Sequence, residues 1–141
     1  MAIDHSQSAI PKPGARKRPK NRTRSKATKE KRDMEIELDA LLSKHTIERD
    51  KCCVKCGSVK ALQAGHIFPK GRVPKLRFEP DNLMAMDTAC HMYFWHRDPL
   101  AAMAWFTKRF PGRYERLQIA AACAPKVDLK LLLTVWRKQN L

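Results

Sequence analysis

The chain has 141 residues, which is enough for one domain with a modest hydrophobic core. Its 29 lysines and arginines exceed its 14 acidic residues by 15, and this excess predicts a polyanionic partner, with nucleic acid first. No apolar run reaches the roughly 18 residues of a membrane span, and the first residues lack the apolar stretch of a secretory signal. We therefore expect a cytoplasmic protein with no membrane partner. Its five cysteines favour metal binding over disulfides in that setting.

Residues 1–32 are expected to form a disordered basic tail. They contain 11 lysines and arginines, two acidic residues and almost no large apolar side chain. Such a segment buries too little surface to offset the entropy of ordering. The tail is expected to add non-specific phosphate contacts, and the alternative is a solubilising arm without a ligand.

The single folded domain is placed at residues 33–141, beginning with a helix at 33–49. Apolar residues recur there at helical spacing, and they predict a helix from about Thr28 to Ile47. The residues on this face are Met34, Leu38, Leu41, Leu42 and Ile47.

Residues 50–97 are rich in cysteine and histidine and are expected to form the metal core of the domain. The sequence predicts a turn at "CVKCG", a short strand around Ala61 to Phe68, and a basic loop with the sequence "PKGRVPKLRFEPDN". A short helix is then expected to begin near Asn82 or Asp87.

Residues 98–141 are predicted to form helices that pack over the cysteine and histidine region. Asp98 is a predicted N-cap with proline at the first helical position. A second helix is expected after Pro111-Gly112, and a third after the N-cap Asp128. We expect Cys123, near a helix end, to be a packing residue. Core packing, rather than base stacking, is expected for the aromatic residues Tyr93, Phe94, Trp95 and Trp105.

A structural zinc site is predicted from four residues in two pairs. Cys53-x-x-Cys56 has zinc-ligand spacing, and the glycine that follows supports a tight turn. The second pair is Asp87-x-x-Cys90, in which a carboxylate takes the place of a thiolate. Cys52 is an alternative donor. The non-functional alternative is that these cysteines are ordinary small buried residues.

His66, Asn82 and His91 follow one another with 15 and 8 residues between them. Together with the cysteine pairs, this order resembles the HNH, or ββα-metal, nuclease family. The resemblance implies a small α+β fold, with a zinc-braced β-hairpin and helix flanked by further α-helices. It also implies a general base at His66, an asparagine at Asn82 that orients the base, and a catalytic divalent metal bound by His91.

Within that family, residues 50–97 resemble the phage NinG/Rap recombination proteins. The matching residues are "CVKCG", "AGH", "PKLRF", "DN" and Cys90. The resemblance implies an endonuclease that acts in recombination or on branched DNA, in the host cytoplasm if the protein is phage-encoded. A junction-specific enzyme would need two active sites, and therefore a homodimer.

Two positions depart from the family pattern. Asp87 stands where the fourth zinc cysteine is usual, and Gly65 stands where many HNH enzymes carry a second ligand to the catalytic metal. His96, a substrate phosphate or water would replace that ligand. His96 lies five residues after His91, so the two share a face only if the helix is distorted or ends there.

The chemistry of phosphodiester hydrolysis suits this set of residues. A neutral His66 would accept a proton from water, and the metal would stabilise developing negative charge. An imidazole ligand widens the choice of metal from Mg²⁺ to Mn²⁺, Ni²⁺ or Zn²⁺. The cations that follow the base are expected to contact phosphates, and they are Lys70, Arg72, Lys75 and Arg77.

Each of these residues also has a non-catalytic interpretation. His66 would then be a hydrogen-bonded strand residue, Asn82 would cap the following helix, and the loop cations would be a solvated rim. The prediction is a metal-dependent DNA endonuclease. The rival is a non-catalytic zinc module that binds DNA or a protein, and a third interpretation, from charge alone, is a zinc protein that binds RNA or the ribosome.

Overall fold

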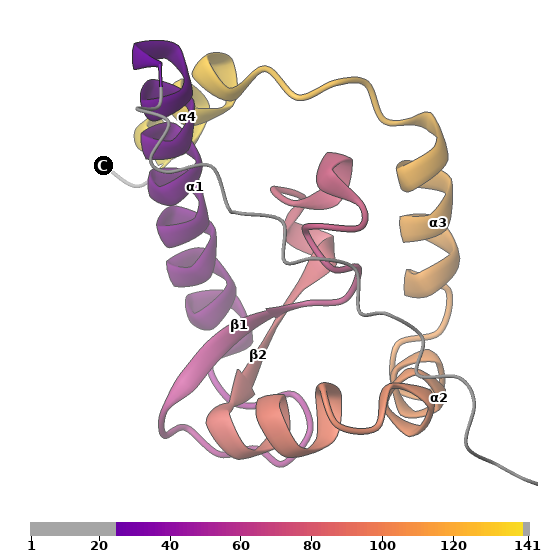
Figure 1. The fold of residues 1–141 in the computed structure, drawn as a ribbon. Coiled ribbons are helices and arrows are strands. Elements are labelled where there is room, and N and C mark those ends of the chain that lie inside the picture. The colour runs from indigo at the N-terminus through magenta and orange to yellow at the C-terminus, as the bar shows by residue number, and fades with distance from the viewer. Residues whose placement is uncertain (1–24, 140–141) are drawn as a thin grey trace, which may run out of the picture.

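A computed structural model describes residues 25–139 of the chain. Within this range the fold is a two-stranded antiparallel sheet surrounded by helices, so the expected small α+β class is confirmed (Figure 1). The expected disorder of residues 1–24 lies outside the described range. The elements in chain order are α1 (Lys26–Asp50), β1 (Leu62–His66), η1 (Pro74–Leu76), η2 (Pro80–Asn82), β2 (Leu83–Asp87), η3 (Cys90–Trp95), α2 (Pro99–Arg109), α3 (Arg113–Cys123) and α4 (Leu129–Gln139).

Helix α1 is longer than its apolar pattern predicts. It begins after Ser25, whose side chain accepts a hydrogen bond from the Thr28 amide, and it ends at Lys51 in a left-handed conformation. The boundary placed at residue 32 is therefore wrong, because residues 26–32 are helical. Those residues expose good helix formers on a capped first turn, so they need no buried face to continue the helix.

Strands β1 and β2 form a hairpin whose register runs from Leu62 opposite Asp87 to His66 opposite Leu83. The strand expected around Ala61 to Phe68 is confirmed as β1. Of the two predicted helix starts, the one near Asn82 is wrong, because residues 83–87 form β2. The helix begins after Asp87, the other predicted start. All five β2 residues are buried, so "LMAMD" shows no alternation that would mark it as a strand.

Helix η3 is a π-helix of six residues that follows the hairpin. The amide of His96 donates to the carbonyl of His91 over 3.2 Å, five residues back. This bond spans one residue more than the bond of an α-helix, and the wider turn changes which side chains share a face.

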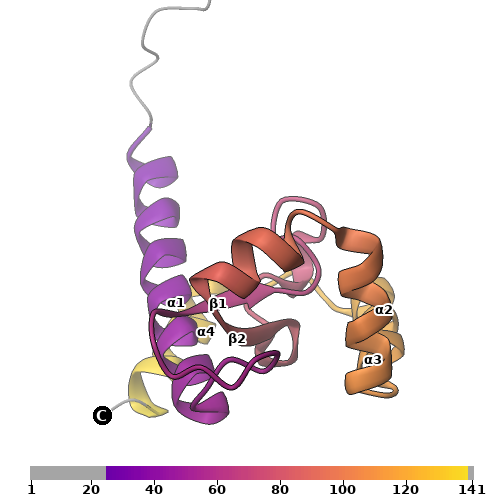
Figure 2. The same cartoon turned by 90° about the horizontal axis from the view of Figure 1, so that it is seen from below.

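The core has two parts, on opposite sides of the hairpin. The first joins the hairpin to η3, α2 and α3 through residues that include Met86, Trp95, Phe106 and Leu117. The second joins α1 to α4 and includes Leu38, Leu42, Leu133 and Trp136. Figures 1 and 2 show α4 beside α1, and α2 and α3 on the other side.

The expected packing of the C-terminal helices is therefore only partly right. Helices α2 and α3 cover the cysteine and histidine region, but α4 packs on α1 instead. The connection after Cys123 carries the chain across the molecule from α3 to α4 (Figure 1). The N-cap roles of Asp98 and Asp128 are confirmed, because their carboxylates accept from amides of the first helical turn.

Two smaller expectations about packing need correction. Tyr93 is 72 % exposed, whereas its neighbours Phe94, Trp95 and Trp105 pack in or against the first core as expected. Cys123 is exposed and not a packing residue, because its side of α3 faces solvent. Over residues 25–139, no helix has both the length and the apolarity needed to cross a bilayer.

Candidate metal centre and histidine cleft

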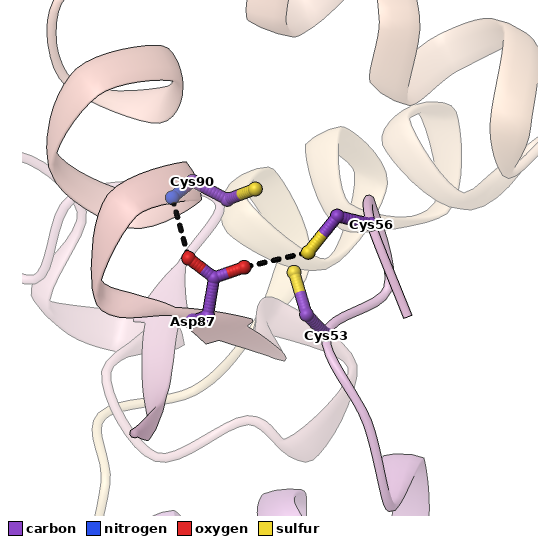
Figure 3. A group of neighbouring side chains, drawn as sticks. All are labelled: Cys53, Cys56, Asp87 and Cys90. Carbon is purple, nitrogen blue, oxygen red and sulfur yellow. Dashed lines mark hydrogen bonds between the residues drawn. The ribbon is translucent and has the colours of Figure 1, made fainter. Parts of the chain in front are cut away.

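Cys53, Cys56, Asp87 and Cys90 come together at one end of the hairpin. Their ligand atoms all lie within 4.8 Å of one another, and Figure 3 shows the side chains pointing toward a common centre. The Cys56 thiol donates to Asp87 Oδ2 over 2.6 Å, and the Cys90 amide donates to Asp87 Oδ1 over 2.8 Å. No other group of three or more such ligands occurs in residues 25–139, and Cys52 is not part of this one.

The turn that carries the first two cysteines is fixed by backbone hydrogen bonds. The Cys53 amide donates to Ser58, and the Gly57 amide donates back to the Cys53 carbonyl. Gly57 has φ +77°, which glycine adopts without strain. The Val54 amide donates to the Ala85 carbonyl, so the turn is attached to β2, which ends at Asp87.

The protonation of this cluster suits a metal site. The Cys56 thiol first, and then the Cys90 amide, hold the pKa of the Asp87 carboxyl well below its usual range. Burial first, and then the Asp87 carboxylate, raise the pKa of the Cys90 thiol. A metal would take the place of the thiol protons that now bridge these groups. Three sulfurs and one carboxylate oxygen form a donor set that tetrahedral zinc accepts.

His91 and His96 form a pair because of the π-helix. Their Nε2 atoms lie 3.1 Å apart, and their ring centroids are separated by 4.6 Å. His91 Nδ1 lies 2.9 Å from the Gln63 side-chain oxygen, which can only accept, so this nitrogen carries the proton. The Nε2 of His91 is then an acceptor, and in this structure it accepts from His96 Nε2–H. Residues five apart share a face only in a distorted helix, and the π-helical geometry of η3 is that distortion.

The absence of a side chain at Gly65 leaves space for the His91 ring. A Cβ atom built at Gly65 would lie 3.1 Å from both Cδ2 and Nε2 of His91. The space that a side chain at residue 65 would occupy is thus filled by the His91 imidazole. Gln63 and Gly65 are two apart on β1 and therefore share the face toward η3.

His66 is the last residue of β1, and a hydrogen bond to its ring defines the tautomer. Its Nε2 lies 3.0 Å from the Arg77 carbonyl oxygen, which can only accept a proton, so the neutral ring has Nδ1 free. Burial first lowers the pKa of His66 below its ordinary value, so the ring is neutral near pH 7. The Trp95 indole donates to the His66 carbonyl over 3.2 Å and fixes the end of the strand.

Contrary to the prediction, Asn82 does not hydrogen-bond to the His66 ring. Its amide nitrogen donates to the carbonyls of Phe68 and Leu76, and its oxygen accepts from the Phe68 amide. Asn82 is fully buried and closes the loop between β1 and η2. It also caps no helix, because β2 follows it. The Arg77 carbonyl, beside Leu76, holds the ring instead.

The four loop cations differ in their surroundings. Lys70, Arg72 and Lys75 are exposed, as phosphate contacts need to be, although Lys70 also pairs with Asp39 at 3.3 Å. Arg77 is not free to contact phosphate, because its guanidinium pairs with Glu35 and Asp39 of α1 and its side chain is only 20 % exposed. The sequence gives no sign of this pairing, because the partners lie 38 and 42 residues away.

A cleft of about 860 Å³ lies between α1, the basic loop, η3 and α2. The residues that line it include His66, His91 and His96, the cations Lys70 and Arg72, and the aromatic residues Phe68, Trp95 and Tyr114. Sequence reasoning missed two polar residues of this region, Gln63 and Asp39. The two-residue spacing from Gly65 could have indicated Gln63, whereas nothing local indicates Asp39.

Comparison with known proteins gives one match. The family model described as Bacteriophage Lambda NinG protein matches residues 4–96, which span both halves of the cysteine and aspartate cluster and end at His96. Searches of the curated proteins and of the solved structures found no match. The matched residues make up about two thirds of the chain. The chain therefore belongs to the NinG family, which is related to phage recombination.

Proposed function

We propose that this protein is an HNH-type endonuclease that uses a divalent metal to hydrolyse DNA phosphodiester bonds during phage recombination. The observation that carries the proposal is the cleft in which His66 and the His91–His96 pair lie beside exposed cations. A general base, two nitrogen ligands and phosphate contacts are the parts that such a reaction needs.

In this proposal His66 is the general base. Its Nδ1 takes a proton from the attacking water, while Nε2–H stays bonded to the Arg77 carbonyl. The lowered pKa keeps the ring in the accepting form near neutral pH. Asn82 acts indirectly as a positioning residue, because it holds the Leu76 carbonyl next to Arg77.

The Nε2 atoms of His91 and His96 would hold the catalytic ion. Their separation of 3.1 Å suits two ligands of one ion, and the bond from His91 Nδ1 to Gln63 fixes the required tautomer. A bound divalent ion would supply charge stabilisation at the phosphate. Two imidazoles favour Mn²⁺, Ni²⁺ or Zn²⁺ over Mg²⁺, and water and phosphate oxygens would complete the coordination.

A structural zinc at Cys53, Cys56, Asp87 and Cys90 would brace the same hairpin. Cys90 is the residue before His91, so the zinc would fix the start of η3 and with it the histidine pair. DNA phosphates would contact Lys70, Arg72 and Lys75 on the loop that follows His66.

The test is a cleavage assay on plasmid DNA and on a synthetic four-way junction, with Mg²⁺, Mn²⁺ or Ni²⁺ against EDTA. We expect metal-dependent cutting that His66→Ala lowers by about 10²–10⁴-fold, the usual contribution of a general base. DNA binding and zinc content should stay unchanged. If the substitution unfolds the protein or releases zinc, the assignment of the base is wrong.

The alternative function is a non-catalytic zinc module that binds DNA. The cysteine and aspartate cluster by itself fits this function as well as it fits an endonuclease. The histidine pair favours the endonuclease, because a purely structural zinc module has no use for two facing Nε2 atoms in a cleft. Retained DNA binding with no cutting under any of the metals would establish the alternative.

A further inference from the structure

We infer that Glu35 and Asp39 of α1, the acidic pair, are positioning residues for His66 and act through Arg77. This inference rests on the proposed role of His66 as the base. It extends the working site beyond residues 50–97, to the middle of helix α1. The chain of contacts runs from α1 to the Arg77 side chain, and from the Arg77 carbonyl to the His66 ring.

The first step is the contact between α1 and Arg77. Asp39 accepts from Arg77 Nε over 3.2 Å and from an Arg77 terminal nitrogen over 2.8 Å, which is a two-point pairing. Glu35, one turn earlier on α1, accepts from the other terminal nitrogen over 2.8 Å. Three hydrogen bonds of this kind set both the position and the plane of the guanidinium.

The second step is the contact between Arg77 and the base. The Arg77 carbonyl is 3.0 Å from His66 Nε2, and this bond keeps Nδ1 free. Arg77 follows η1, and its amide makes only a long bond of 3.2 Å to Pro74. The backbone of residue 77 is therefore held by Asn82 through Leu76 and by the acidic pair through its own side chain.

The acidic pair lies in an otherwise unfavourable place. Asp39 lines a cleft that would receive phosphates, where its negative charge opposes DNA binding and also pairs with Lys70 at 3.3 Å. If it were only a surface charge, its removal would strengthen DNA binding and leave turnover unchanged. A positioning role predicts a different result, in which DNA binding is kept and turnover falls.

The experiment compares Asp39→Asn and Arg77→Lys with wild type in the full-length, zinc-loaded protein. Glu37→Gln is the matched control, because Glu37 is on the same helix but pairs with Arg137 of α4. We expect Asp39→Asn and Arg77→Lys to lower kcat by roughly tenfold. The KM for DNA should be unchanged or lower in Asp39→Asn, and Glu37→Gln should behave as wild type.

A second measurement does not depend on cleavage. Long-range ¹H–¹⁵N NMR of the DNA-free protein should show His66 as the Nε2–H tautomer in wild type and in Glu37→Gln. Asp39→Asn and Arg77→Lys should show a mixture of tautomers, with circular dichroism and zinc content unchanged. An unchanged His66 signal in both variants would overturn the inference. If wild type cuts no DNA, the proposed function fails, and the NMR result still decides the role of the acidic pair.

Discussion

Gly65 and His91 show how single residues shape this site. The absence of a side chain at Gly65 leaves room for the His91 ring, which then reaches both Gln63 and His96. Gly65 is thus the neighbour that leaves space for the histidine pair. Asp87 accepts from the Cys56 thiol with one carboxylate oxygen and from the Cys90 amide with the other.

Gly65→Ala should weaken divalent metal binding at the histidine pair by roughly tenfold or more. The new Cβ would lie 3.1 Å from two atoms of the His91 ring, and the ring would have to shift by a few tenths of an ångström away from its ligand geometry. Calorimetric titration of the zinc-loaded protein with Mn²⁺ or Ni²⁺ measures the effect. Gly71→Ala is the control, because a Cβ at Gly71 has nothing within 4 Å. Equal affinity in the two variants would argue against His91 as a ligand.

Asp87→Asn should speed the loss of zinc, and Asp87→Cys should slow it. The first change removes the anionic ligand, and the second restores a fourth thiolate. Release of zinc to a coloured chelator measures both rates, with about one equivalent expected in wild type. Cys123→Ser is the control, because Cys123 is exposed and is not one of the four clustered residues. Asp87→Asn with the release rate of wild type would mean that Asp87 is not a ligand.

Among the elements, α1 has two partners on two faces. One face packs on α4 through Leu38 and Leu42, and another carries the acidic pair that holds Arg77. Helix α4 lies in the same core cluster as Phe78 and Leu83, next to the site. The π-helix η3 also has two roles. Its first residue, Cys90, belongs to the cysteine and aspartate cluster, and its geometry brings His91 next to His96.

Leu133→Ala should lower the free energy of unfolding by about 2–5 kcal/mol, the usual cost of a cavity in a core. Leu133 is 5 % exposed between α4 and α1. Leu131→Ala, on the same helix but 65 % exposed, should have little effect and serves as the control. Urea unfolding followed by tryptophan fluorescence measures both variants. Equal stability of the two would contradict the packing of α4 on α1.

At the scale of the whole molecule, charge is divided between the fold and the segment before it. Residues 1–24 contain seven of the 29 lysines and arginines and one acidic residue. Within the fold, several cations are already paired, including Arg49 with Asp50, Arg77 with the acidic pair and Arg137 with Glu37. We therefore expect the seven cations of residues 1–24 to contribute to DNA binding.

Deletion of residues 1–24 should flatten the salt dependence of DNA binding. Each lost phosphate contact lowers the slope of log K against log salt by about 0.9. Fluorescence anisotropy with labelled duplex DNA from 50 to 300 mM salt, roughly the range used for such slopes, measures it. The cut starts before Ser25, so that the N-cap of α1 is kept. An unchanged slope would mean that this segment does not touch phosphate.

The sequence by itself determined the features that depend on neighbouring residues. The apolar spacing of α1, the N-caps Asp98 and Asp128, and the cysteine pair with its glycine turn are all local. Asp87 was found because its spacing to Cys90 matches that of the first pair. Short-range geometry restricts such features strongly, so residue identity and spacing are sufficient to predict them.

The tertiary structure alone decided how distant segments meet. The pairing of Arg77 with α1, the hydrogen bonds of Asn82 and the place of α4 all join residues far apart in the chain. Strand β2 has no alternation because both of its faces are buried, and His96 meets His91 only because the helix gains a residue in one turn. These features follow from packing between segments, for which spacing along the chain holds no signal.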